Sequence, residues 1–281
     1  MTVKIDVGLL DADILRYELG SIEMPHPFLG EGVTTPCSEK KIEELLHDRI
    51  EGIKQAIGTD NILSLLTGKG NFRDEVSDLE PYKGNREGST KPFHWQTVDE
   101  LLKGEYGAVE VHGNEADDVL GLTARAEQAK GRTPVICSRD KDLRMVEGWH
   151  YSWPCGEHQP EKPLYYISEE EGERWFWTQM LTGDATDNIM GCGFRIDKIY
   201  KSGARKGQPY RQRQGIGPKA AEGILVNCKS TKDYFKLVRS SYIKIFGEDA
   251  EKRMLEMGRL LYIGQTKEKQ WELPYDFTAE L

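Results

Sequence analysis

Short apolar runs alternate with longer stretches of helical periodicity along much of the chain. The runs are rich in β-branched residues and bounded by turn-forming residues, which predicts buried strands at 3–10, 61–66, 106–111 and 133–137. Between them, apolar residues at helical spacing predict helices at 38–53, 95–102 and 115–130. Because strands and helices alternate, the pattern predicts an α/β fold with a mostly parallel central sheet flanked by helices.

The pattern changes in the second half of the chain. Residues 149–163 are irregular, and 164–167 predict an edge strand. From Ser168, a predicted N-cap, the pattern favours helices at 168–181, 232–246 and 248–262. Residues 194–214 interrupt this series, and Gly203 and Gly207 within them predict a flexible insert. At 281 residues the chain is long enough for one α/β body with a helical appendage.

Acidic residues follow the predicted strands, where open α/β sheets bind their ligands. They lie after the first, third and fourth strands and after the aromatic helix at 175–181: Asp11, Glu115, Asp117, Asp118, Asp140, Asp142, Asp184 and Asp187. Eight carboxylates gathered in one place cannot all stay ionised, and two divalent cations would remove the conflict. Two structural explanations stay open as alternatives to metal binding. Asp11 can serve as a helix N-cap, and acidic residues stabilise the first turn of the helix at 115–130.

Basic residues gather in two irregular segments. The first, 72–94, holds Arg73, Tyr82, Lys83 and Arg86, which suit phosphate binding and base stacking, although a solvated surface loop is the alternative. The second is the insert 194–214, which has a single acid, Asp197. Its cations include Lys201, Arg205 and Lys206. A helix is then predicted to begin within the segment that holds Gly215, Gly217 and Lys219. The glycines let the backbone approach a ligand closely, and backbone amides at a helix N-terminus attract phosphate, as in a helix-hairpin-helix.

Composition refines this interpretation. The net charge of −9 by itself argues against a polyanionic partner. However, bound metal ions would neutralise the metal-binding acids, and the cations are clustered, so the net charge does not exclude such a partner. Five scattered cysteines without a C-x-x-C favour reduced thiols and a cytoplasmic setting. Cys155 and His158 have the chemistry of zinc ligands, but no second ligand pair is spaced to complete a tetrahedron. Neither a membrane span nor a signal peptide is predicted.

Taken together, six motifs resemble the 5′-nuclease superfamily in order and rough spacing. That superfamily holds flap endonucleases, the 5′-exonuclease domains of bacterial DNA polymerases, and phage 5′-3′ exonucleases. The motifs are Asp11 after an apolar strand, Tyr82-Lys83-Gly84-Asn85-Arg86, Glu115-Ala116-Asp117-Asp118, Asp140-Lys141-Asp142, Gly183-Asp184-Ala185-Thr186-Asp187-Asn188 and Gly215-Ile216-Gly217-Pro218-Lys219. The basic insert departs from the compact flap-endonuclease pattern. Both this insert and the Asp11-Ala12-Asp13 motif are most similar to the stand-alone exonucleases of short-tailed phages.

The resemblance implies a PIN-like catalytic domain at 1–188 carrying a helical arch at about 72–93. A helical DNA-binding region would follow at 189–281, with a helix-three-turn-helix (helix-hairpin-helix) at 215–226. Asp11, Glu115, Asp117, Asp118 and Asp140 match a tighter metal site, and Asp142, Asp184 and Asp187 match a second. Lys83 and Arg86 match arch cations near the scissile phosphate, and Tyr82 matches a base-stacking position. The implied cofactors are two Mg²⁺, replaceable by Mn²⁺, with K⁺ at the helix-hairpin-helix.

The expected function is therefore magnesium-dependent 5′-3′ exonuclease activity on DNA, with flap cleavage and removal of RNA primers as further activities. The expected partners are 5′ ends of duplex, flap or gapped DNA and RNA–DNA hybrids, for a cytoplasmic monomer in phage replication or recombination. One alternative is a haloacid-dehalogenase-type phosphatase with Asp11 as nucleophile. Another is a non-catalytic, structure-specific DNA-binding protein. Sequence does not separate exonuclease from flap preference.

Overall fold

The computed structural model describes residues 3–28 and 31–279, which form two compact units. The sheet unit comprises 1–71, 88–168 and 263–267, and the helical unit comprises 72–87, 169–262 and 268–281. The predicted domain boundary at 188 stays a prediction. In the structure, the helix after Ser168 packs with the later helices. Segment 72–87, predicted as part of the catalytic domain, also belongs to the helical unit.

The sheet unit is built on six strands in the order β5-β4-β1-β6-β7-β8. Their bounds are β1 Val7–Asp11, β4 Ile62–Asn71, β5 Val109–Gly113, β6 Pro134–Cys137, β7 Gly148–Ser152 and β8 Lys162–Ile167. All neighbours pair in parallel except β8, which is antiparallel at the edge. The chain runs from β1 to β4 and β5 on one side and then crosses to β6 on the other. The carboxyl ends of β1 and β6 therefore meet at a topological switch point.

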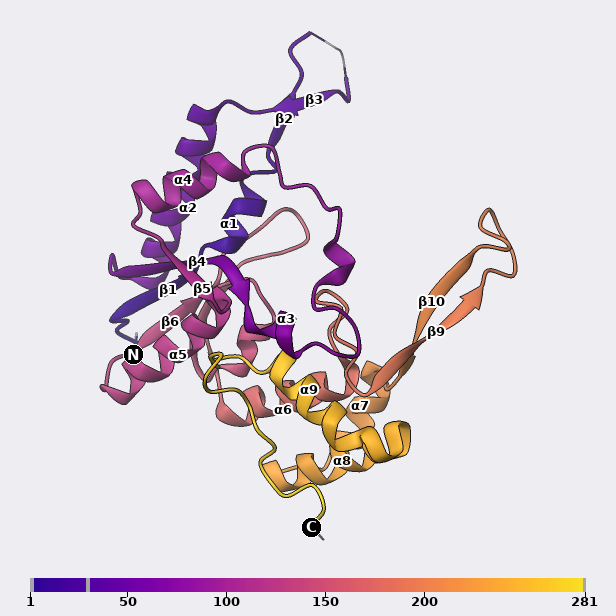
Figure 1. Ribbon diagram of the computed structural model, residues 1–281. Helices are drawn as coiled ribbons and strands as arrows, with labels where there is room; N and C mark the ends of the chain where they lie inside the picture. The colour runs from indigo at the N-terminus through magenta and orange to yellow at the C-terminus, as the bar shows by residue number, and fades with distance from the viewer. Residues whose placement is uncertain (1–2, 29–30, 280–281) are drawn as a thin grey trace. The chain divides into compact units, whose positions relative to one another are not determined.

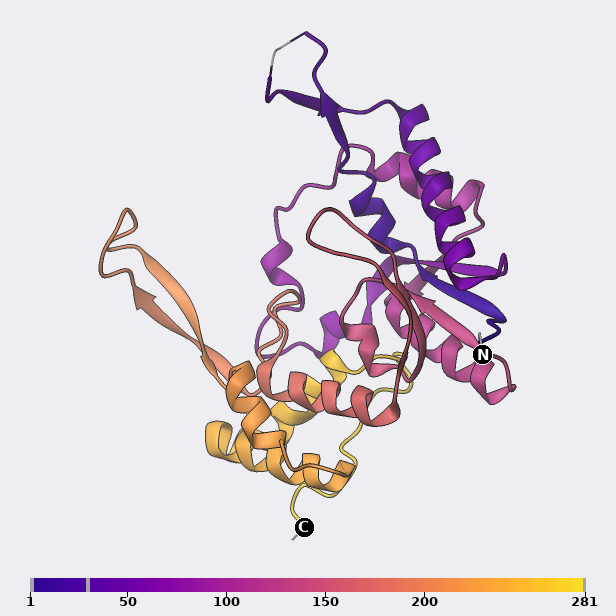
Figure 2. The ribbon, with the colours of Figure 1, turned by 180° about the vertical axis from the view of Figure 1, so that it is seen from behind.

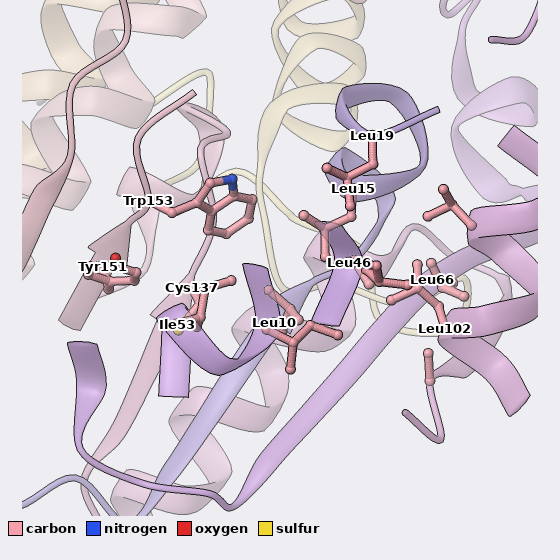
Figure 3. Close-up of a cluster of buried hydrophobic side chains, with 14 of the residues drawn as sticks. Leu10, Leu15, Leu19, Leu46, Ile53, Leu66, Leu102, Cys137, Tyr151 and Trp153 are labelled. Carbon is pink, nitrogen blue, oxygen red and sulfur yellow. The ribbon is translucent and has the colours of Figure 1, made fainter. Parts of the chain in front are cut away.

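The helices of the sheet unit cover both faces of the sheet (Figure 1). On one face lie α1 Asp13–Glu18, α2 Glu39–Ile57 and α4 Trp95–Gly104, and on the other lies α5 Ala116–Ala129. Figure 3 shows the core on the first face, where Leu10, Leu46 and Leu66 pack with Trp153. The apolar spacing of α2 dictates this burial, and Ser38 caps α2 as predicted by accepting a hydrogen bond from the Lys41 amide. Residues 23–25 and 34–36 add a small hairpin, β2 and β3.

The helical unit packs around an aromatic cluster. Its main helices are α6 Glu169–Thr182, α7 Pro218–Leu225, α8 Thr231–Phe246 and α9 Ala250–Leu261. Phe176 and Trp177 of α6 contact Trp271, and Trp177 also stacks on Tyr234 of α8. Gly258 of α9 lies against Trp271 so closely that an added Cβ would come within 2.1 Å of the indole. The described part of the chain contains no helix that could span a bilayer.

Two segments differ from the predictions. Residues 149–163 were expected to be irregular, but β7 begins at Gly148 and is buried on both faces, so it lacks the alternation that identifies a half-buried strand. Residues 194–214 were expected to be flexible, but β9 Gly193–Ile199 and β10 Pro209–Gly215 form an antiparallel ribbon. In the arch segment the helical turns are short, namely α3 Phe72–Val76 and the 3₁₀ turn η1 Gly84–Arg86.

Candidate active-site residues

Asp11 lies at the carboxyl end of β1, where it is 3% exposed. Its carboxylate accepts a hydrogen bond of 2.7 Å from the Ser138 hydroxyl, which in turn accepts one of 2.9 Å from the Asp140 amide. Ser138 and Asp140 directly follow β6, the parallel neighbour of β1. The predicted meeting of Asp11 and Asp140 at one sheet edge is therefore observed within this unit.

Asp117 brings another carboxylate to this group from the first turn of α5. Burial, and then the nearby carboxylates of Asp11, Asp140 and Glu115, raise the pKa of Asp117 well above its usual range. Burial also raises the pKa of Asp11 to about 8, with further contributions from the Asp13 and Asp140 carboxylates against the lowering effect of the Ser138 hydrogen bond. The fold thus holds mutually repelling carboxylates together, and they need protons or a cation to coexist.

Glu115 is the N-cap residue of α5 and is 8% exposed. The next residue, Ala116, donates its amide to the Thr67 hydroxyl at 2.9 Å, which fastens the start of α5 to β4. Asp142 begins the turn η2 Asp142–Met145, and its amide donates to the Asp140 carboxylate at 2.7 Å. Both acids are therefore positioned by backbone contacts next to the strand ends.

Asp13 belongs to the same group, although it was not among the predicted metal ligands. Its carboxylate accepts hydrogen bonds of 3.0 and 3.1 Å from the Thr67 amide and pairs with Arg16. Arg16 also donates to Asp99 at 2.9 Å, so this cation is shared between two acids. The Asp13 charge helps to raise the pKa values of both Asp11 and Asp117. The Asp-Ala-Asp spacing was the signal in the sequence.

Asp118 has a different orientation from Asp117. It is completely buried, and one carboxylate oxygen accepts hydrogen bonds of 3.1 Å from the Gly264 amide and 3.4 Å from the Gln265 amide. Consecutive helical residues point about 100° apart, which explains the separation of the two side chains. The structure gives Asp118 a role in holding residues 263–267 on the sheet unit, and its predicted role as a metal ligand stays a prediction.

In the helical unit, Asp184 and Asp187 lie in a tight turn after α6. The Asp184 amide donates to the Ile189 carbonyl at 2.9 Å, and the Ile189 amide returns a bond of 2.8 Å. Gly183 has φ +68°, and a Cβ there would meet the Ile189 carbonyl oxygen at 2.2 Å, so the turn requires glycine. The turn brings carboxylate oxygens of the two aspartates within 4.8 Å of each other.

Three residues of segment 77–87 converge on Asp187 within the same unit. The Tyr82 hydroxyl donates to its carboxylate at 3.0 Å, the Lys83 ammonium lies 3.6 Å away, and Arg86 forms a second ion pair. Lys83 and Asn188 both have left-handed backbone, with φ of 53° and 61°, which is uncommon outside glycine. The predicted arch residues and one predicted metal ligand therefore form a single charged cluster.

Other predicted nucleic-acid-binding residues differ in exposure. Arg73 is 1% exposed and its guanidinium donates to the carbonyls of Leu260 and Tyr262 at 2.9 and 3.0 Å. Arg73 therefore links α3 to the end of α9, and its predicted contact with nucleic acid stays a prediction. The remaining basic candidates outside the Asp187 cluster are exposed, namely Lys201, Arg205, Lys206 and Lys219. Gly217 is the N-cap of α7 and Gly215 ends β10.

Cys155 and His158 do not form part of a group of three potential metal ligands among the described residues. In the loop between β7 and β8, the backbone of Cys155 pairs with that of Gln159 as an isolated antiparallel β-bridge.

Comparison with solved structures shows that this fold is similar to that of structures solved for bacteriophage T5. The chain aligns over 89% of its length with a bacteriophage T5 protein co-crystallised with metal ions, with a TM-score of 0.54, 16% identity and 88% of that chain covered. It aligns equally widely with T5 5′-exonuclease carrying bound zinc, with a TM-score of 0.55 and 16% identity. The predicted α/β fold with a mostly parallel central sheet flanked by helices is thereby confirmed.

Two sequence relatives are DNA polymerases I. That of Rhizobium leguminosarum is 26% identical over 160 residues, and that of Bacillus caldotenax is 31% identical over 144 residues. These matches cover 55% and 47% of this chain but only 14% and 16% of the polymerases. No family model matches the chain.

Proposed function

We propose that this protein is a divalent-metal-dependent nuclease that hydrolyses phosphodiester bonds of DNA from 5′ ends. The observation that carries the proposal is the group of carboxylates at the switch point of the sheet, where Asp11 and Asp117 have strongly raised pKa values. Such a group is suited to a hard cation, because all its ligand atoms are carboxylate oxygens. The T5-like fold and the DNA polymerase I matches support the same activity.

The residues proposed for metal binding in the sheet unit are Asp11, Asp13, Glu115, Asp117, Asp118, Asp140 and Asp142. Asp184 and Asp187 of the helical unit are proposed to contribute to the same hydrolysis. A divalent cation bound by these oxygens supplies positive charge at the phosphate and makes a bound water more acidic. Mg²⁺ is the proposed ion, with Mn²⁺ as a substitute.

The cations of the helical unit would act on the substrate directly. Lys83 and Arg86 would stabilise the charge that develops on the phosphate as the bond breaks. Tyr82 would orient them, because its hydroxyl shares the Asp187 carboxylate with both. The start of α7, with Gly215, Gly217 and Lys219, is proposed to hold the DNA backbone in a helix-hairpin-helix manner with K⁺. We further propose that the protein removes RNA primers from RNA–DNA hybrids and cleaves flaps. It would act as a monomer and serve in phage replication.

The test uses DNA labelled at the 5′ or the 3′ end as duplex, flap and RNA–DNA hybrid substrates, each with Mg²⁺ and with chelator. The proposal expects short products released from 5′ ends in Mg²⁺ only, and loss of cleavage in Asp117→Asn. Activity on a small phosphate monoester without activity on DNA would favour the phosphatase alternative. Tight binding without hydrolysis in any divalent metal would favour the non-catalytic alternative.

A further inference from the structure

The β9–β10 ribbon extends from α7 away from the other helices of its unit, as both views show (Figures 1 and 2). Its strands pair without interruption from Gly193↔Gly215 to Ile199↔Pro209. At roughly 3.4 Å per residue, such strands reach on the order of 20 Å. Gly193 and Gly215 allow the backbones to close at the base, where a Cβ on Gly215 would meet the Cys192 carbonyl oxygen at 2.5 Å.

One face of the ribbon is fastened to the helical unit. Because directly paired residues share a face, Arg195, Arg211 and Arg213 lie together on it. Arg195 and Arg211 both donate to the Glu80 carboxylate, the shortest bond being 2.6 Å from Arg211. The Arg213 guanidinium donates to the Met190 carbonyl at 2.8 Å. These three arginines are used by the fold, so they are not the cations available to a partner.

The outer part of the ribbon carries four cations whose charge no nearby carboxylate neutralises. These cations are Lys198, Lys201, Arg205 and Lys206. Lys198 is partly buried and the other three are exposed. Among the described residues, no carboxylate lies within ion-pair distance of any of the four. A polyanion is the partner that this charge fits, since unneutralised cations at the end of a rigid arm attract phosphates.

The aromatic residues at the same end argue for a duplex rather than a single strand. Single-strand binding relies on aromatic faces open to the bases. Here Tyr200 stacks on Tyr210 with ring centroids 4.3 Å apart, and the Arg205 guanidinium lies 4.4 Å from the Tyr200 ring. These contacts occupy Tyr200 and stiffen the tip. A two-stranded ribbon also has a width that the major groove of B-DNA admits, at about 12 Å.

We propose that the outer half of the β9–β10 ribbon binds the phosphate backbone of duplex DNA, independently of base sequence. This inference rests on the proposed function for the identity of the nucleic acid. The ribbon is then a docking arm whose base is fixed by Glu80 and whose tip supplies four phosphate contacts. Its role is to hold the duplex part of the substrate, separately from the residues that perform the cleavage.

The test measures the affinity of the full chain for a labelled duplex and for the matching single strand, in chelator, between about 50 and 200 mM salt. In the variant K198Q/K201Q/R205Q/K206Q, the slope of log affinity against log salt for duplex should become shallower by about 3–4, because each lost phosphate contact removes about 0.9. The single-strand slope should change much less. The exchange variant K198R/K201R/R205K/K206R keeps the charges and should keep the duplex slope, which separates charge from folding.

The control variant neutralises four exposed lysines that are not part of the ribbon: Lys40, Lys41, Lys130 and Lys244. Its duplex slope should equal that of the wild type. An unchanged slope in the ribbon variant would overturn the inference, and equal losses on duplex and single strand would overturn the assignment to duplex. If the wild type fails to cleave DNA in Mg²⁺ while the ribbon effect is present, the proposed nuclease activity fails and the docking arm stands.

Discussion

At the scale of single residues, the sheet unit concentrates charge where burial disfavours it. Asp11 receives hydrogen bonds from the Ser138 hydroxyl and the Asp13 backbone, yet burial and the Asp13 and Asp140 carboxylates outweigh them and raise its pKa to about 8. A purely structural acid at a strand end would be exposed or paired with a cation. Arg16 pairs with Asp13 and Asp99, and the described contacts give Asp11 no such partner. The arrangement is destabilising by itself and becomes favourable once positive charge is present.

The raised pKa of Asp11 makes stability depend on pH. Between its usual value in unfolded chains, about 4, and the folded value of about 8, the folded protein holds a proton that the unfolded chain has lost. The free energy of unfolding should therefore fall as pH rises through this range in chelator. Asp11→Asn should make the protein at pH 8 more stable by about 1.4 kcal/mol or more, the equivalent of one pKa unit.

This prediction is checked by urea unfolding of the wild type and the variant at several pH values in chelator. Asp60→Asn, at an exposed position of the same unit, is the control and should keep the wild-type pH dependence. A wild-type stability that rises steadily from pH 5 to pH 8 would contradict the assignment of Asp11.

Lys83 is expected to act on the reaction more than on binding. Its ammonium is 28% exposed beside the Asp187 carboxylate, where it can reach a bound phosphate. Loss of one donor to the transition state typically lowers the rate by a factor on the order of 10²–10³. Lys83→Ala should therefore lower the single-turnover rate on DNA by about that factor, while the Kd for DNA weakens less. Lys40→Ala on α2 is the matched control, and a wild-type rate in Lys83→Ala would exclude the role.

At the scale of elements, the Glu80 carboxylate joins segment 77–87 to the ribbon. Its side chain is 8% exposed and accepts from both Arg195 and Arg211. Glu80→Gln removes the charge from the three hydrogen bonds that Arg195 and Arg211 donate to this carboxylate, which should lower the free energy of unfolding by about 1–3 kcal/mol. Amide exchange in β9 and β10 should become faster, because the ribbon loses its fixed base.

Urea unfolding and hydrogen exchange by mass spectrometry measure these two effects. Asp197→Asn offers a control on the ribbon itself, since that side chain is 90% exposed and lies 3.8 Å from Arg211. It should leave stability and exchange unchanged. Exchange in β9 and β10 that is equally slow in Glu80→Gln would show that the strand pairing alone holds the ribbon.

The sequence allowed prediction of those elements whose patterns are local. The strands β1, β4, β5 and β6 follow from apolar runs, and α2 follows from its spacing and its Ser38 cap. The ribbon was missed because its pairing joins Gly193 to Gly215 across a long loop, and its Arg-rich pattern hides the alternation. Asp13 was not among the predicted metal ligands because its contact with the Thr67 amide depends on which strand lies beside β1. The burial of Arg73 depends likewise on the docking of α9.

At the scale of the whole molecule, the net charge of −9 hides two opposite requirements. Carboxylates gathered on the sheet unit need cations, and cations at the outer end of the ribbon need a polyanion. Divalent metal should therefore stabilise the protein even without DNA. If, as proposed, Mg²⁺ binds the folded carboxylate group and not the dispersed acids of the unfolded chain, it should add about 2.7 kcal/mol of stability at 100 times its Kd.

Thermal unfolding in Mg²⁺ and in NaCl of equal ionic strength separates specific binding from screening. The midpoint temperature should rise with Mg²⁺ well beyond the rise with NaCl, and the difference should shrink in Asp117→Asn, which removes one oxygen ligand. The gain should also be larger at pH 8 than at pH 5, because the metal competes with protons for the carboxyls of Asp11 and Asp117, whose pKa values are raised. Equal midpoints in the two salts would mean that these carboxylates rely on protons alone, and the proposed metal-dependent hydrolysis would lose its physical basis.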